Sequence, residues 1–315
     1  MPAAAISGRA GNSASGGAVG AQDDSPDYRE QTGMAERARD QLGRFGVWRG
    51  ASQVTPELAG VIEQAGFGAL WLGGSPGGDL RQVDELLDAT RTLTVATGIV
   101  NMWQDEAGRV AASFARIEAR RPGRFLLGVG AGHREAIQRY ARPYETLVAY
   151  VDALLAAGVP ADSLVLAALG PKVLRLAAER TAGAHPYLVT PEHTRRARAI
   201  LGDGPLLAPE HKVVLEPDPQ RARAIGRPRV RNPYLGLVNY TSNLRRLGWT
   251  DEDLSDGGSD ALIDALVAHG TPGQVAARLR EHLAAGADHV SIQLLTAPGA
   301  DPAAGYRQLG QALAL

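Results

Sequence analysis

Short apolar runs alternate with amphipathic stretches along most of this chain, and this alternation constrains the fold more than any other sequence feature. Each run has the length and the bordering turn residues of a buried strand. The stretches between the runs carry helix-start signals, as at Thr55-Pro56-Glu57, where an N-cap residue, a proline and an acid follow one another. The expected strands are 45–48, 69–72, 93–100, 125–132, 163–168, 184–189, 206–216 and 289–295.

Eight strands alternating with helices predict an α/β protein, specifically a (β/α)8 TIM barrel, because right-handed strand–helix–strand units close into a barrel at that number. A doubly wound parallel sheet is the structural alternative. Between the seventh and eighth strands, a long excursion from Asp218 to about Gly270 has a mostly helical pattern, with a loop at 255–259. A terminal helix is expected over residues 307–315.

Composition limits the classes of protein to which this chain can belong. The 315-residue chain is 44% hydrophobic, which supports a single barrel domain over 41–315, whereas 1–40 is rich in Ala, Gly and Ser and is predicted to be a disordered arm. A formal net charge of -1 gives no electrostatic basis for binding nucleic acid or an anionic membrane. The absence of Cys excludes disulfides, thiolate nucleophiles and cysteine-based metal sites. No apolar run approaches the roughly 20 residues that cross a bilayer, and no signal-peptide pattern is present, so a cytoplasmic protein is expected.

The stretch 121–133, RPGRFLLGVGAGH, combines a turn, a short apolar strand and three glycines at alternate positions, Gly128, Gly130 and Gly132. In a strand, this spacing removes side chains from one face, so a flat ligand can lie against it. Tight packing of small residues in a barrel core explains the same pattern equally well. His133 follows at the carboxyl end of the strand, where parallel sheets and barrels place their chemistry.

Two further stretches at strand ends are candidates for ligand contact. Residues 167–172, AALGPK, pass from a strand directly into a helix, so free N–H groups and the positive helix end can seat a phosphate, with Lys172 nearby. An ordinary strand-to-helix turn is the alternative. In 97–101, TGIVN, Gly98 interrupts an apolar strand, which indicates a bulge or a close approach to a ligand, unless it is a plain strand containing a glycine.

The other strand ends carry few groups that could act without a cofactor. No pair of acids stands there for hydrolysis by two carboxylates, and no Lys ends an inner strand for Schiff-base chemistry. The histidines are scattered without the spacing of metal ligands, so no metal site is expected. This set of residues suits a site in which a bound cofactor supplies the reactivity. The remaining candidates at strand ends are Trp48, Gly73, Gly74, Thr190, His211 and Gln293.

Taken together, ATGIVNMW (96–103), RPGRFLLGVGAGH (121–133) and the stretches 166–193 and 270–293 resemble the bacterial luciferase-like superfamily of flavin and deazaflavin oxidoreductases. The resemblance is closest to its coenzyme F420-dependent branch in actinobacteria, and it extends from about Leu42 to the C-terminus. It implies a barrel that holds the deazaflavin at the strand carboxyl ends. It also implies hydride transfer between F420 and a small organic substrate, and it is compatible with a homodimer.

The resemblance also assigns roles to particular residues. A bulge with a non-prolyl cis peptide supports the ring in the family, and its match here is Gly98-Ile99. His133 takes the position of an acid that transfers protons in the sugar-phosphate dehydrogenases of the branch. It is therefore expected to donate or accept a proton, or else only to hydrogen-bond the cofactor. Trp48 and Trp103 are expected to line the substrate side. The expected cofactor contacts are Gly98, Ile99, Asn101, Gly130 and His133, with Ala167, Ala168, Leu169 and Gly170 as the phosphate seat.

One departure from the family pattern bears on the substrate. The sugar-phosphate dehydrogenases carry an Asp-His pair after the second strand, whereas this chain has Gly73-Gly74-Ser75, so sugar-phosphate oxidation is not expected. An FMN-dependent monooxygenase of the same fold is the alternative to an F420-dependent oxidoreductase. A flavin-binding barrel without catalytic activity is a second alternative.

Overall fold

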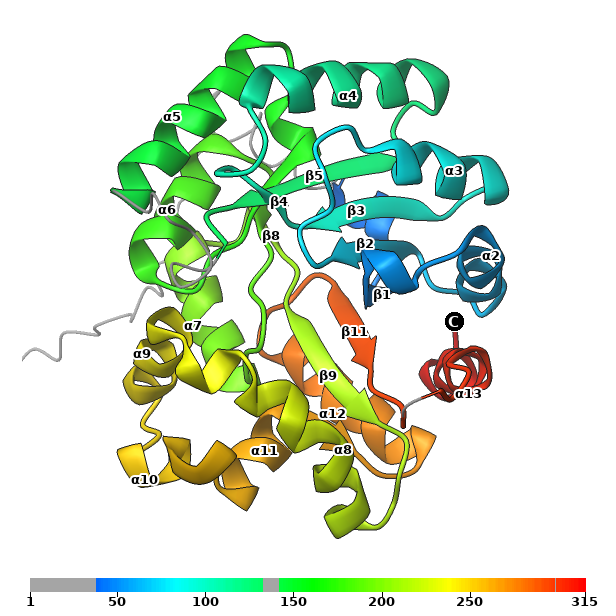
Figure 1. Ribbon diagram of the computed structural model, residues 1–315, viewed down its shortest axis with the longest axis vertical. Coiled ribbons are helices and arrows are strands. Elements are labelled where there is room, and N and C mark those ends of the chain that lie inside the picture. The colour runs from blue at the N-terminus through cyan, green and yellow to red at the C-terminus, as the bar shows by residue number, and fades with distance from the viewer. Residues whose placement is uncertain (1–37, 133–141, 298) are drawn as a thin grey trace, which may run out of the picture.

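The computed structural model describes residues 38–132, 142–297 and 299–315, with the strands in the middle of the molecule and most helices around them (Figure 1). The strands are β1 (Phe45–Gly50), β2 (Ala69–Gly73), β3 (Thr94–Gly98), β4 (Val100–Asn101), β5 (Phe125–Gly130), β6 (Leu164–Leu166), β7 (Gly183–Ala184), β8 (Leu206–Leu207), β9 (Glu210–Val214), β10 (Val267–His269) and β11 (Val290–Leu294). The α-helices are α2 (Pro56–Gln64), α3 (Arg81–Ala89), α4 (Ala107–Arg120), α5 (Pro143–Ala156), α6 (Pro171–Arg180), α7 (Pro191–Leu201), α8 (Pro219–Arg231), α9 (Val238–Arg246), α10 (Asp251–Leu254), α11 (Asp260–Leu266), α12 (Pro272–Ala284) and α13 (Ala303–Leu313).

The strands pair in parallel and the sheet closes on itself. Its neighbours run in the order β11, β1, β2, β3, β5, β6, β7 and β8. The segment 206–214 completes the ring because it bonds on both sides. The N–H of Ala208 donates to the Ala184 oxygen at 2.9 Å, and the N–H of Ser291 donates to the Pro209 oxygen at 2.9 Å. The predicted α/β barrel is therefore confirmed, and the doubly wound sheet is excluded.

Several strand bounds differ from the predicted ones, and the third predicted strand is divided into β3 and β4. The seventh strand is divided into β8 and β9, because Pro209 lies between them and has no N–H to donate to a neighbouring strand. The sixth strand ends at Ala184 instead of residue 189. The predicted helical excursion contains one strand, β10, which pairs with β9 so that Val267 lies opposite Lys212. The rest of the excursion is helical as predicted, and the C-terminal helix begins earlier, at Ala303.

Some predictions fall on residues outside the described ranges. Residues 1–37, which make up most of the predicted arm, and the helix expected near 135–139 belong to this group. Among the residues that are described, no helix is long and apolar enough to span a bilayer.

The inside of the barrel is filled by aromatic side chains. Trp71 on β2 is fully buried, and its indole stacks on the His185 ring with the ring centroids 4.0 Å apart. The Trp71 Nε1–H donates to His289 Nε2 at 3.1 Å, and His289 Nδ1–H donates to the Gly43 oxygen at 2.7 Å. Gly46 makes room for this arrangement, because a Cβ there would lie 2.8 Å from the His289 ring. The interior is thus a packed core, and a ligand is expected at its mouth, where the strands end.

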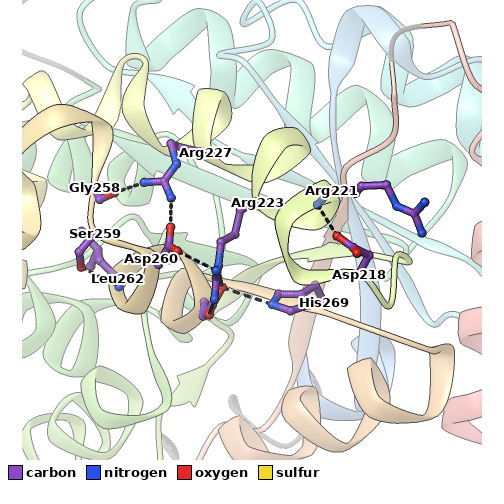
Figure 2. Close-up of polar contacts among 10 residues, drawn as sticks. Asp218, Arg221, Arg223, Arg227, Gly258, Ser259, Asp260, Leu262 and His269 are labelled. Carbon is purple, nitrogen blue, oxygen red and sulfur yellow. Dashed lines mark hydrogen bonds and ion pairs between the residues drawn. The ribbon is translucent and has the colours of Figure 1, made fainter.

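An ion-pair network joins α8 to α11 (Figure 2). Arg223 on α8 donates from Nε to Asp264 Oδ1 at 2.8 Å and from Nη1 to Asp260 Oδ2 at 2.7 Å. His269 on β10 lies 3.2 Å from Asp264 through its Nε2, and Arg227 pairs with Asp260. Asp264 therefore links three elements of the excursion: α8, α11 and β10.

We expect Asp264→Asn to lower the free energy of unfolding by about 1 kcal/mol, a discounted value for charge-assisted bonds at a partly exposed site. The amide cannot accept two bonds from a guanidinium and one from a histidine with the same strength. Asp251→Asn is the matched control, because Asp251 is 82% exposed and pairs only with Arg245 among the described residues. Urea denaturation of the two variants measures the difference, and an equal loss in both would contradict a stabilising role for this network.

Candidate functional site

Glycines line the mouth of the barrel, but side chains of the chain itself cover them. A Cβ on Gly73 would lie 1.9 Å from the Trp48 ring, and one on Gly98 would lie 2.8 Å from Trp48 Nε1. A Cβ on Gly130 would lie 2.8 Å from the Ala167 Cβ and 3.2 Å from Ile99 Cγ1. The face free of side chains that was predicted over Gly128, Gly130 and Gly132 is therefore wrong at Gly130. The glycines let neighbouring groups pack closely, which is the alternative left open by the sequence.

The β3 end has the irregular backbone that the sequence indicated. Gly98 pairs with Gly73 of β2, whereas the next paired residue, Val100, belongs to β4 and lies opposite Val129 of β5. The peptide bond between Gly98 and Ile99 is cis, as the resemblance implied. The predicted bulge is thus confirmed, and Ile99 lies between the two short strands with its side chain over Gly130.

Two buried polar atoms next to Gly98 have no hydrogen-bond partner among the described residues. They are Trp48 Nε1 and His185 Nε2, at 2.8 and 3.1 Å from the position of a Gly98 Cβ. His185 Nδ1 lies 2.7 Å from the Ala208 oxygen, so it carries the ring proton and leaves Nε2 as a hydrogen-bond acceptor. Burial lowers the pKa of His185 to about 4, so the imidazole is neutral at pH 7. A donor and an acceptor therefore stand together at the bulge, and sequence reasoning had not singled out His185.

The turn before α6 has the features of an anion seat. Gly170 is the N-cap of α6, and no side chain caps the helix there, so its first N–H groups stay available. The guanidinium of Arg246 on α9 lies 4.0 Å from the position of a Gly170 Cβ. His193 Nε2 donates to the Leu169 oxygen at 3.0 Å, and burial together with Arg246 and Arg196 lowers the pKa of His193 to about 4. The start of α6, which we call the phosphate seat, is thus positively charged. Arg246 stands 76 positions after Gly170 in the chain, so no local sequence motif could have predicted this contact.

A buried ion pair lies on the inner side of β9. Lys212 Nζ is 3.0 Å from Glu210 Oε1, and neither side chain is more than 1% exposed. Lys212 Nζ also lies 3.9 Å from the centroid of the Tyr187 ring. Burial raises the pKa of Glu210 and lowers that of Lys212, although their mutual attraction opposes both shifts. Lys212 lies in the middle of β9 and not at its end, so the prediction that no Lys ends an inner strand is not contradicted here, although sequence reasoning had not singled out this buried pair.

The other predicted site residues have different surroundings. Asn101 is buried and accepts from the N–H of Trp103 at 3.0 Å, so it shapes the turn after β4. Thr190 caps α7 by accepting from the N–H of His193.

His211 lies 2.9 Å from His282 of α12, in the buried layer between strand and helices instead of at the mouth. Gln293 accepts from the Tyr187 hydroxyl at 2.9 Å at the end of β11, and His133 lies outside the described residues.

Within the described ranges, no group of three or more His, Asp or Glu side chains is placed to hold a metal ion. The polar groups that converge at the mouth are instead single donors and acceptors around Gly98 and the α6 start. Their arrangement can bind a planar polar molecule with an anionic group, and it can orient that molecule against Trp48 and Ile99.

Residues 41–158 match the family of luciferase-like monooxygenases. Solved structures with the same fold include an F420-dependent secondary alcohol dehydrogenase in complex with an F420–acetone adduct (TM-score 0.65, 15% identity, covering 86% of this chain and 98% of that one). They also include the coenzyme F420-dependent tetrahydromethanopterin reductase from Methanopyrus kandleri (0.64, 15%, 86% and 98%). A third is the oxygenating constituent of 3,6-diketocamphane monooxygenase from Pseudomonas putida, in complex with FMN (0.60, 14%, 85% and 96%).

No protein with a curated description matches the sequence significantly. The sequence match over residues 41–158 and the shared fold nevertheless confirm the predicted resemblance to the luciferase-like superfamily. The neighbours include proteins named for F420 and one solved with FMN, so the likeness establishes the fold and leaves the cofactor to be decided.

Proposed function

We propose that this luciferase-like protein is an F420-dependent oxidoreductase that passes hydride between the deazaflavin and a small organic substrate. The observation that carries the proposal is the uncapped, positively charged start of α6 beside Arg246, which suits the phosphate of such a cofactor. We propose F420 instead of FMN as the cofactor, because the stretches 96–103 and 121–133 resemble the F420-dependent branch.

The residues at the mouth fit a cofactor of this kind. The unpartnered Trp48 Nε1–H and His185 Nε2 offer one donor and one acceptor to the polar edge of a deazaflavin ring. Ile99 and Trp48, which cover the glycines, are proposed to face the ring, and the turn 167–170 with Arg246 is proposed to hold the phosphate. When bound, the deazaflavin supplies the carbon centre that gives or takes hydride.

The side chains of the protein itself have to position the substrate and to donate or accept one proton. Trp48 and Trp103 are proposed to line the substrate side, and their indoles would help to exclude water from the reacting atoms. His133 remains the proposed group that exchanges the proton. If it does, His133→Ala should lower turnover while leaving cofactor binding intact, whereas a role limited to binding would give the opposite pattern.

Separate titrations with F420 and FMN test the proposal. We expect the wild type to bind F420 with a dissociation constant on the order of 1 µM and not to bind FMN. Arg246→Ala should weaken F420 binding by about 10- to 100-fold, because it removes a charged group from the phosphate seat. Arg245→Ala is the matched control, since its neighbour Arg245 is 51% exposed and pairs with Asp251. Binding of FMN alone would favour the monooxygenase, and F420 binding without turnover of any substrate would favour the non-catalytic barrel.

A further inference from the structure

A cleft of about 580 Å³ opens at the carboxyl ends of β1 and β11 and extends to the segment 299–301 that precedes α13. Its lining includes Trp48, Arg49, Ser52, Arg229, Gln293 and Asp301. Trp48 belongs both to this cleft and to the cover of Gly98. A molecule that fills the cleft therefore reaches the indole beside the proposed cofactor site, and the volume is in the range of small-molecule sites.

Hydrogen-bond donors dominate this cleft. Arg49 donates from Nε to the Gln53 oxygen at 3.2 Å and from Nη1 to the Tyr306 hydroxyl at 3.4 Å, and no carboxylate of the described residues pairs with it. Arg229 is exposed on α8, and no ion pair or hydrogen bond of its guanidinium is found within the described ranges. Two guanidinium groups thus face the cleft without counter-ions.

The side-chain amide of Gln293 adds a third donor. The Tyr234 hydroxyl donates to the Tyr187 hydroxyl at 3.0 Å, and Tyr187 in turn donates to Gln293 Oε1 at 2.9 Å. Because this relay occupies the amide oxygen, the NH2 group of Gln293 is left for a ligand. The one acidic side chain in the lining, Asp301, already accepts from the N–H of Ala303 at 3.0 Å.

The cleft is also separate from the phosphate seat. In the ring of strands, β2, β3 and β5 lie between β1 and β6, and the seat follows β6. On the other way round, β7 and the segment 206–214 lie between β6 and β11. The two positively charged places are therefore on opposite sides of the mouth, and each can hold a different anion.

We propose that this cleft binds the anionic group, a carboxylate or a phosphate, of the substrate, and that Arg49, Arg229 and Gln293 hold it. This inference rests on the proposed function, because it takes the cofactor to occupy the opposite side. Arginine forks and amide N–H groups match the oxygens of both anions, so the oxyanion is the chemistry that they share. The substrate would reach from this anchor past Arg49 to Trp48.

Calorimetric titration of the full-length, cofactor-free protein tests the inference. The probes are succinate, inorganic phosphate and the uncharged succinamide. We expect succinate or phosphate to bind with a dissociation constant on the order of 1 mM, and succinamide not to bind. Arg229→Glu and Arg49→Gln should each weaken anion binding at least 10-fold. Because Arg229 is exposed and has no ion pair or hydrogen bond of its guanidinium among the described residues, its substitution should not disturb the fold, and Arg81→Glu at an exposed position of α3 is the control.

Comparing succinate with phosphate shows which anionic group the substrate carries. Tighter binding of succinate identifies a carboxylate substrate, and tighter binding of phosphate identifies a phosphorylated one. Equal binding of succinamide, no binding of either anion, or anion binding that Arg246→Ala removes and Arg229→Glu leaves intact would overturn the inference.

Titration with F420 separates this inference from the proposed function. Arg229→Glu should bind F420 as the wild type does. A wild type that fails to bind F420 contradicts the proposed function even if the cleft holds an anion. A protein that binds F420, and whose anion binding does not respond to Arg229→Glu or Arg49→Gln, contradicts only the inference.

Discussion

Lys212→Met is expected to lower the free energy of unfolding by about 3–5 kcal/mol, the usual loss when one partner of a buried ion pair is removed. Lys212 and Glu210 are both completely buried, with 3.0 Å between Nζ and Oε1. Among the described residues, Glu210 Oε2 accepts one bond, from the N–H of Leu188 at 2.9 Å. Without Lys212, the carboxylate must stay charged in an apolar interior or take up a proton, and both states are unfavourable at pH 7.

The double variant Glu210→Gln/Lys212→Met separates the effect of the two charges on stability from the effect of packing around them. It removes both charges and keeps similar volumes, so we expect it to recover most of the stability lost in Lys212→Met. Lys172→Met is the matched control, because Lys172 is exposed and its Nζ lies 3.7 Å from the Tyr144 ring centroid. The control should change stability by less than about 1 kcal/mol. A double variant as unstable as Lys212→Met alone, in urea denaturation, would mean that packing and not charge holds this position.

Local patterns predicted the barrel because each strand and helix has its own signal. Thr55 caps α2 as expected and accepts from the N–H of Leu58, and Pro171 opens α6 at the predicted residue. The bulge at Gly98 and the cis peptide bond to Ile99 were also anticipated from a short motif and its resemblance to a family. Such features depend on a few consecutive residues, so one sequence contains the information.

The site could be predicted only in part, because long-range packing decides it. Gly128, Gly130 and Gly132 have the spacing of an open face, but the side chain of Ile99 covers Gly130 and that of Asn101 lies over Gly132. Trp48 from β1 likewise covers Gly98. Arg246 reaches the α6 start from α9, and the bond from His185 Nδ1–H to the Ala208 oxygen leaves His185 Nε2 as an acceptor. None of these relations has a sequence spacing that a pattern could find. The assignments of His133 and Trp103 remain predictions.

Acid should destabilise this protein well above the range in which surface carboxylates are protonated. Burial lowers the pKa of His185, His193, His211 and His289 in the folded state to about 4. In the unfolded chain the same groups titrate near 6.5. Between these values the unfolded state binds protons that the folded state excludes, so stability is complete above pH 6.5 and falls as the pH drops toward 4.

The change in the free energy of unfolding per pH unit gives the size of this acid destabilisation. Each of the four histidines adds up to about 1.4 kcal/mol of lost stability per pH unit below 6.5, so the loss from pH 7 to pH 5 exceeds about 4 kcal/mol. Buried Glu210, with its raised pKa, acts in the opposite direction and offsets a part of this loss. Urea denaturation at several pH values measures the slope, and about 0.5 M NaCl should leave it in place because salt screens exposed pairs far more than buried groups. Stability that stays constant between pH 7 and pH 5 would show that these histidines accept protons in the folded state, and the neutral His185 at the centre of the proposed site would then have to be abandoned.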